Sequence, residues 1–524
     1  MLSYSYRETG FLKAFASAII LALLLLFSPE YGIAAETNVD ITIDMDSAKK
    51  VNPDLFGFQM AEFRNCDISD TAFRQYVTTL KPKVLRFPFG SWANFYHPDG
   101  MGYGFRDEEL KRIEGTGTYA TLERFNKFYK EKPADRNYIN QFIELSKLTD
   151  SKVLVIANIA TGTEEELLSM IRQMKQSGVN VVGVELGNEL YLDSYANLVR
   201  NVDDYISKAE RFASAVRKSY PDLKIAVTAA PARFDRKIGF LRASSYDNWN
   251  NSLAKKKFYD AYVVHSYKSV SNCEKESTLE GTFSCASGEL MNYSNKDLQK
   301  VIDYYYCIFG KEKSVWLTEW NIELPIKFGN TDLQALYSAD FLLSQTRIDA
   351  TSMGNIEYSL FHDLCDKWYA FSVVNTKFSG EEAIDPGSNY IRRCSYFPFQ
   401  FMKDAFADNV VRLTTSKSGI PDDNTFSSHA FLNQSKSELY IYFLNWSGNT
   451  YIAKNSFKNN NYRLPKEADF DYFSGNSLFA SRGVTGFKKE LGDLHAFKTS
   501  SGVMSLQSVK ISPYSFGVLK IKLQ

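Results

Sequence analysis

Two stretches, Val-Glu-Leu-Gly-Asn-Glu-Leu at 184–190 and Val-Trp-Leu-Thr-Glu-Trp-Asn at 315–321, decide the fold of this chain. Each begins with a short apolar run that predicts a buried parallel strand, and each places a glutamate, Glu189 or Glu319, at the C-terminal end of that strand. The sequence between them has room for further βα units. Residues at the C-terminal ends of barrel strands meet on one face, so we expect both carboxylates on a common rim.

Six more apolar runs complete the pattern. They alternate with helical segments, including one that opens at 163 with an acidic first turn and one at about 331–350, and this alternation is typical of a parallel α/β fold. The six expected strands are 55–60, 83–87, 153–158, 225–229, 261–265 and 356–361. With the runs that end at Glu189 and Glu319 they make eight, the number that closes a barrel, so we predict a (β/α)8 TIM barrel over 51–406.

Two long segments, 89–136 and 266–294, follow the C-terminal ends of strands and are expected to wall a cleft. After about residue 407 the sequence changes to short alternating segments separated by Asn, Gly and Ser turns. This predicts an antiparallel β-sandwich over 407–524, to which the segment 36–50 is expected to add a strand.

The first 35 residues predict a signal peptide. Arg7 and Lys13 precede an apolar run, 14–27, that is too short to span a bilayer comfortably, and small residues follow it. An uncleaved anchor is the alternative. We expect the mature chain to be secreted or periplasmic, with no membrane association after cleavage.

Charge and composition narrow the class of function. Lys+Arg and Asp+Glu both number 61, so the formal net charge is zero, which argues against a nucleic-acid partner. Aromatic residues make up 15% of the chain, which fits either a well-packed core or platforms for sugar rings. Because the sequence has neither clustered Cys/His spacing nor a Gly-rich phosphate loop, we expect no metal and no cofactor.

The six cysteines fit an oxidising compartment. Cys273 and Cys285 flank one polar loop and predict a disulfide, and Cys365 with Cys394 is the second expected pair. Cys307 is interpreted as a buried thiol.

Glu189 and Glu319 together point to cleavage of glycosidic bonds. That reaction needs one carboxylic acid to protonate the leaving oxygen and one carboxylate to act as nucleophile or base. Each glutamate alone has a structural alternative: Asn188 and Glu189 could cap a helix start, and Glu319 could belong to an ion pair. Their expected position on one rim favours catalysis.

The motifs Gly-Asn-Glu at 187–189 and Thr-Glu-Trp-Asn at 318–321 resemble those of clan-A retaining glycoside hydrolases. The resemblance implies that Glu189 is the acid/base and Glu319 the nucleophile. It extends to the α-L-arabinofuranosidase, β-xylosidase and heparanase-like branches. Segments 52–57, 85–90 and 513–515 resemble the first barrel strand, the second barrel strand and the last sandwich strand of arabinofuranosidases. The chain departs from them at Phe89, Ser91 and Leu190, where Gly, a sugar-binding Asn and Pro are usual.

Four further residues are candidates for substrate binding near the glutamates. By resemblance Arg86 lies beneath the nucleophile, with a rim ion pair as its alternative. Tyr267 could hydrogen-bond Glu319 or simply pack. His265 could bind substrate or support Tyr267, or be a core histidine. Asn188 can hydrogen-bond a sugar 2-hydroxyl.

Aromatic rings and one more carboxylate complete the candidate site. Trp92 and Trp320 are candidate sugar platforms, whereas Trp316 and Trp446 are expected in cores. Glu62 resembles a sugar-binding glutamate and could equally be a solvated loop carboxylate.

The sequence therefore predicts an exported retaining glycoside hydrolase with a carbohydrate substrate. The sugar (arabinoside, xyloside, glucuronide or another), exo or endo action and the oligomeric state stay open. Two alternatives remain: a transglycosylase that uses the same residues, and a catalytically silent carbohydrate-binding protein on the same fold.

Overall fold

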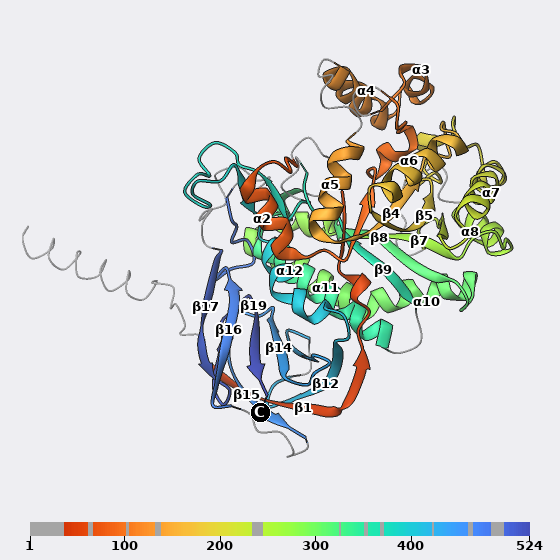
Figure 1. The fold of residues 1–524 in the computed structure, drawn as a ribbon. Coiled ribbons are helices and arrows are strands. Elements are labelled where there is room, and N and C mark those ends of the chain that lie inside the picture. The colour runs from red at the N-terminus through yellow and green to blue at the C-terminus, as the bar shows by residue number, and fades with distance from the viewer. Residues whose placement is uncertain are drawn as a thin grey trace, which may run out of the picture.

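A computed structural model shows a barrel joined to a β-sheet domain (Figure 1). It describes residues 36–523 apart from 61–65, 101–103, 131–137, 233–244, 324–325, 351–354, 367–370, 422–423, 459–464 and 484–496. The predicted signal peptide, residues 1–35, lies outside the described residues. Within them, no helix is both long and apolar enough to cross a membrane.

Eight parallel strands close the predicted TIM barrel, so this prediction is confirmed. Their continuous apolar runs are buried on both faces, as in other parallel sheets. The strands are β2 (Gly57–Gln59), β3 (Val84–Phe87), β4 (Lys152–Ala157), β5 (Asn180–Leu186), β6 (Lys224–Thr228), β7 (Ala261–Lys268), β8 (Ser314–Ile322) and β9 (Ile356–Phe361).

The barrel interior is filled by side chains around Trp316, which is fully buried as expected. Its indole Nε1 donates to Glu357 at 3.0 Å. Gly183 on β5 makes room for the ring, because a Cβ built there would lie 2.3 Å from the Trp316 ring. The barrel therefore holds a packed core below its C-terminal rim.

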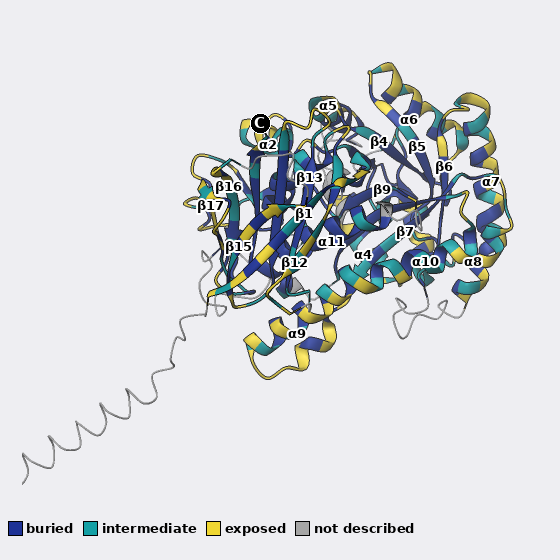
Figure 2. Cartoon of the chain, turned by 90° about the horizontal axis from the view of Figure 1, so that it is seen from below, coloured by how far each residue is buried: buried dark blue, intermediate teal, exposed yellow. Residues whose placement is uncertain are grey.

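Helices surround the barrel, and all but α11 are amphipathic, with buried residues toward the strands and exposed ones outside (Figure 2). The helix predicted from 163 begins with a capping box between Thr163 and Glu166. The surrounding helices are α2 (Thr71–Leu80), α5 (Ile139–Thr149), α6 (Glu164–Gln176), α7 (Val202–Ser219), α8 (Tyr246–Ala254), α10 (Leu298–Phe309) and α11 (Asp332–Ala350).

The two long segments on the rim contain short helices. The first carries η3 (Ser91–Phe95), α3 (Asp107–Leu110), η4 (Lys111–Ile113) and α4 (Gly117–Lys130), and the second carries η8 (Ser271–Lys275) and α9 (Leu279–Asn292). The predicted Cys273–Cys285 disulfide joins η8 to α9. The expected Cys365–Cys394 pair is wrong, because the structure has no bond between these two cysteines and each contacts a different residue: Cys394 Sγ lies 3.3 Å from the Asn330 carbonyl oxygen, whereas the Cys365 carbonyl oxygen lies 3.5 Å from Cys66 Sγ. Cys307 is exposed, not buried, because it lies on the outer face of α10.

The C-terminal domain is one nine-stranded sheet that encloses its own apolar core. Its strand order is β17-β16-β19-β14-β13-β12-β1-β15-β18. The strands are β1 (Glu36–Lys50), β12 (Val411–Ser418), β13 (Phe426–Leu432), β14 (Glu438–Asn445), β15 (Thr450–Phe457), β16 (Glu467–Ser474), β17 (Lys498–Ser505), β18 (Val509–Ile511) and β19 (Ser515–Lys522). Pairing is antiparallel as predicted except between β1 and β15, which run parallel.

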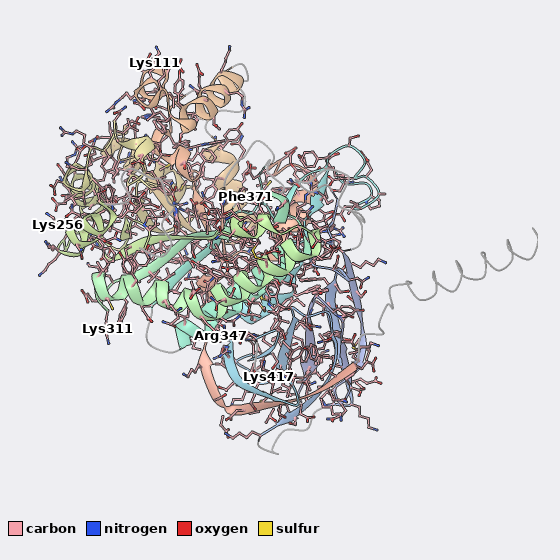
Figure 3. All side chains as sticks on the ribbon, turned by 180° about the vertical axis from the view of Figure 1, so that it is seen from behind. Lys111, Lys256, Lys311, Arg347, Phe371 and Lys417 are labelled. Atoms are coloured by element: carbon pink, nitrogen blue, oxygen red, sulfur yellow. A yellow bond between two sulfur atoms is a disulfide. The ribbon has the colours of Figure 1, made fainter. Side chains whose placement is uncertain are left out.

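The helices α11 and α12 (Tyr396–Met402) lie between the barrel and the sheet (Figure 1). Apolar residues occur all round α11, as expected for a helix that packs against both parts. Arg347 of α11 lies where the barrel helices meet the C-terminal sheet (Figure 3). It donates to Asn295 Oδ1 at 2.7 Å. The packing against both faces of α11 holds the two parts together.

An ion cluster around the buried His97 connects the α3 segment to the start of α6. The His97 side chain is fully buried, with Nε2 2.7 Å from Glu109 and Nδ1 2.9 Å from Glu166, which Arg106 also contacts at 2.8 Å. Burial opposes the charged imidazolium, yet the two carboxylates raise the pKa of His97 to about 9. Burial also opposes the Glu166 carboxylate, but His97 lowers the pKa of Glu166 to about 2.

We expect His97→Gln to destabilise the protein most between about pH 4.5 and 6.5, by on the order of 3 kcal/mol. The pKa of His97 is higher in the folded chain, so its contribution is fully present below the unfolded value of about 6.5 and is lost as the pH rises to about 9. The pKa of Glu166 is lower in the folded chain, so its contribution is lost as the pH falls from about 4.5 to about 2.

Thermal midpoints of wild type and variant across this pH range measure the effect. The control is Glu36→Gln, which breaks the exposed Glu36–Lys510 pair and should change little. A difference between wild type and His97→Gln that stays constant from pH 5 to 10 would show that the imidazolium contributes nothing.

Candidate active site

Glu319 lies on β8 inside the C-terminal rim, with each carboxylate oxygen bound by a donor. Arg86 Nη1, from β3, is 2.6 Å from Oε1, and the Tyr267 hydroxyl, from β7, donates to Oε2 at 2.7 Å. The β7–β8 register shifts at His265, so that Thr318 is an extra residue on β8. Such a bulge re-aims the side chains that follow it, and here it turns Glu319 toward the rim.

The environment of Glu319 keeps this carboxyl group ionised. Burial alone would raise its pKa, but the charges on His265 and Arg86, with the Tyr267 hydrogen bond, lower the pKa to about 2. Arg86 is fully buried and remains charged, because Glu185 and Glu319 together raise its pKa against the effect of burial. A carboxylate fixed in this way is suited to nucleophilic attack.

Glu189 follows the end of β5 in a tight turn rather than standing on the strand itself. Gly187 has φ +83° and Glu189 has φ +48°, so two of three consecutive residues adopt left-handed conformations. The side chain of Glu189 is 22% exposed, against 8% for Glu319. The Tyr191 hydroxyl donates to its Oε1 at 3.2 Å.

His265 of β7 lies between the two carboxylates. Its Nδ1 is 2.9 Å from Glu189 Oε1 and 3.7 Å from Glu319 Oε2. Burial disfavours the imidazolium, but the two glutamates raise the pKa of His265. Because both oxygens contact one nitrogen, they can be no farther apart than the sum of these two distances.

Asn188 is held in position by Asn94, a residue that the sequence analysis missed. Asn94 Nδ2 donates to the Asn188 carbonyl at 2.7 Å, and the Asn188 amide donates to Asn94 Oδ1 at 2.9 Å. Arg86 Nη2 donates to Asn188 Oδ1 at 2.8 Å, which leaves Asn188 Nδ2 buried with no protein acceptor. That N–H is available to a substrate hydroxyl. Asn94 lies three residues after Ser91, the position where arabinofuranosidases usually have a sugar-binding Asn. An asparagine so close to that position was the signal in the sequence that could have identified Asn94.

Three more polar residues belong to the site and were not predicted: the buried Glu185 and Gln59, and the half-buried His362. Glu185 Oε2 accepts a hydrogen bond from Arg86 Nε at 2.9 Å and so holds the guanidinium in position. Gln59 of β2 is fully buried, and both polar atoms of its side chain lack a protein partner. His362, at the end of β9, packs edge-on against Tyr267, and burial lowers its pKa. Glu185 precedes Asn188 in the same motif, but one sequence does not distinguish it from a surface carboxylate.

The expected sugar platforms have different outcomes. Trp320 as a platform is wrong, because it is 1% exposed and its ring packs against Phe341, Phe361 and Phe399. Trp92 of η3 is half-buried beside Phe105 and stays a prediction. Trp446 is buried, as expected. Glu62 lies outside the described residues. Within the described ranges, no group of three or more His, Cys, Asp or Glu side chains could hold a metal ion.

Comparison with solved structures finds the same architecture. The α-L-arabinofuranosidase of Thermotoga maritima, in an arabinose complex, is 12% identical over 93% of this chain and 100% of that chain, with a TM-score of 0.64. The chain has the fold of clan-A glycoside hydrolases. The GH51 arabinofuranosidase of Xanthomonas axonopodis pv. citri is 13% identical over the same shares, with a TM-score of 0.61.

A Paenibacillus polymyxa xyloglucanase of glycoside hydrolase family 44 is 11% identical over 93% of this chain and 100% of that chain, with a TM-score of 0.57. No protein-family model and no curated protein sequence matches the chain. At these identities the likeness establishes the fold, and the argument for function rests on the site.

Proposed function

We propose that this chain is a retaining glycoside hydrolase in which Glu319 is the nucleophile and Glu189 the general acid and base. The observation that carries the proposal is the contact of one His265 nitrogen with both carboxylates. The sum of the two contact distances is the upper limit of the gap between these carboxylate oxygens. This limit lies at the lower edge of the roughly 6.5–9.5 Å gap of inverting enzymes, so a gap shorter than the limit favours retention. Retaining enzymes have a gap of about 5–5.5 Å, which excludes a water between carboxylate and sugar.

In the first step Glu319 attacks the anomeric carbon while Glu189 protonates the leaving oxygen. Arg86 and Tyr267 hold the Glu319 carboxylate in one orientation, so little reorganisation is needed on attack. Asn188 Nδ2 donates to the sugar 2-hydroxyl, a contact that strengthens in the transition state.

In the second step Glu189, now ionised, takes a proton from water, which attacks the same anomeric carbon and releases Glu319. Two inversions restore the original configuration. Glu189 suits this exchange with solvent because its side chain is more exposed than that of Glu319. In a transglycosylase a sugar hydroxyl would take the place of water.

Net retention at the anomeric carbon is the expected outcome. Proton NMR of the first-formed sugar, recorded before mutarotation, reads its configuration directly. An initial product of opposite configuration would overturn the assignment of Glu319 as nucleophile. A total lack of sugar release from every glycoside would instead favour the silent binding protein, and glycosides longer than the substrate would favour the transglycosylase.

The proposed substrate is a polysaccharide or oligosaccharide, and the mature protein is proposed to be secreted or periplasmic. Solved neighbours named as an arabinofuranosidase and a xyloglucanase support beginning with arabinofuranosides and xyloglucan. The apolar run at 14–27 and the disulfide support export. Intact mass of natively produced protein that still includes residues 1–30 would contradict signal cleavage.

A further inference from the structure

Cys66 and Cys365 lie against each other at the rim of the barrel. Cys66 follows β2 and Cys365 follows β9, and both are buried, at 3% and 0% exposure. Cys66 Sγ is 3.5 Å from the Cys365 carbonyl oxygen, and only two covalent bonds separate that oxygen from the Cys365 Cα. Burial and a hydrogen bond with the Cys365 side chain raise the pKa of the Cys66 thiol.

The backbones of both cysteines are fixed by one hairpin, β10 (Val374–Thr376) and β11 (Tyr390–Arg392). Cys365 forms a β-bridge with Val374, and the amide that follows Cys66, that of Asp67, donates to the Tyr390 hydroxyl at 2.7 Å. The fold therefore holds the backbones of the two cysteines close to each other.

These cysteines stand just above the seam where the barrel closes. The first and last strands, β2 and β9, share only two register pairs, Gly57 with Leu360 and Phe58 with Phe361. The longest pairing in the barrel, β7–β8, has eight. Above the seam the Leu364 amide donates to the Gln59 carbonyl at 3.0 Å, and the Cys66–Cys365 contact follows. The seam is the barrel's shortest pairing, so a covalent bond there would reinforce closure where the fewest register pairs join two strands.

We infer that Cys66 and Cys365 form a second disulfide that staples the barrel seam when the chain folds in an oxidising compartment. The inference is independent of the proposed reaction. The cysteines are 299 residues apart in sequence, and linking residues so distant restricts the unfolded chain strongly. The Cys273–Cys285 disulfide shows the same chain using a disulfide elsewhere on the rim.

The oxidant is a small-molecule or protein disulfide, such as glutathione disulfide. The thiolate of one cysteine attacks a donor sulfur, forms a mixed disulfide and displaces one donor thiolate. The second cysteine, once deprotonated, attacks the mixed disulfide and displaces the other. Two electrons pass to the donor, and the two protons end on its two thiols. The thiolate attacks while the chain is still folding, before burial raises the pKa of the Cys66 thiol.

The test is a thiol count on protein recovered from an oxidising compartment, or refolded with glutathione and glutathione disulfide, then denatured without reduction. In the structure Cys66, Cys307, Cys365 and Cys394 are all thiols. If Cys66 and Cys365 become linked on oxidation, two thiols per chain are expected, those of Cys307 and Cys394. Cys66→Ala should raise the count to three by freeing Cys365, whereas the control Cys394→Ala should lower it to one. Peptide mapping should find Cys66 linked to Cys365.

Four thiols in wild type, in protein whose Cys273–Cys285 peptide is linked, would overturn the inference, and so would a Cys365–Cys394 linkage. Thermal midpoints give a second readout. The thermal midpoint should fall by the same amount, roughly 5 °C, in Cys66→Ala, in Cys365→Ala and in the double variant. The loss is equal because all three lack the same bond. Losses that add in the double variant would mean two separately packed thiols and no bond.

Discussion

Glu319→Ala should lower kcat by about 10⁵-fold or more on every glycoside, whatever its leaving group. The variant loses the atom that attacks the anomeric carbon, and the described residues offer no second carboxylate bound by both Arg86 and Tyr267. A good leaving group cannot compensate, because the first covalent step itself is missing. Steady-state kinetics on an aryl glycoside and on an oligosaccharide measure the effect.

A small anion should partly restore the activity of Glu319→Ala. Azide in the space left by the carboxylate would attack the aryl glycoside directly and give a glycosyl azide of inverted configuration. The matched control is Glu467→Ala, which removes an exposed glutamate on β16 and should leave kcat unchanged. Residual activity within tenfold of wild type would exclude Glu319 as the nucleophile.

Glu189→Ala should distinguish substrates that Glu319→Ala does not. Its loss removes general acid catalysis, worth about 10²–10⁴-fold, so cleavage of oligosaccharides should fall by that factor. Activated aryl glycosides need no proton on departure, so their first step should be nearly unchanged. Without a base the covalent intermediate should then accumulate, giving a burst of phenol followed by slow turnover.

Azide should accelerate that slow turnover, because it needs no general base, and should give a glycosyl azide of retained configuration. This product differs in configuration from that of the Glu319 variant, so one NMR experiment assigns both roles. Equal losses on oligosaccharide and aryl substrates, with no burst, would contradict the assignment of Glu189.

The barrel was predictable because buried parallel strands are continuous apolar runs, and the expected strand 356–361 coincides with β9. The position of Trp320 was not predictable. Strict alternation along β8 would put Trp316 and Trp320 on the same side, but the extra residue Thr318 reverses the alternation. Glu319 therefore faces the site while Trp320 packs against Phe341 of α11. A bulge leaves no mark in composition or apolar periodicity.

The residues that contact Glu189 and Glu319 could likewise be predicted only in part from the sequence. Arg86, Tyr267 and His265 were predictable as candidates because they lie at strand ends, where side chains converge. Asn94 and Glu185 act through hydrogen bonds to residues of other elements, and Gln59 lies beside Arg86 in the β2–β3 register. These positions depend on the three-dimensional arrangement of the elements. Burial of a polar side chain with no protein partner, as at Gln59, can be seen only in coordinates.

The place of β1 in the C-terminal sheet has a consequence for how the protein is made. β1 is the first described strand, yet its two neighbours, β12 and β15, begin at Val411 and Thr450. A ribosome adds roughly 5–20 residues per second, so β1 waits for tens of seconds before either neighbour exists. During that interval its apolar face, Val39, Ile41 and Ile43, has no sheet to join. In the nascent chain the apolar face of β1 therefore stays uncovered until most of the chain has been synthesised. We expect a chaperone to bind β1 during this interval.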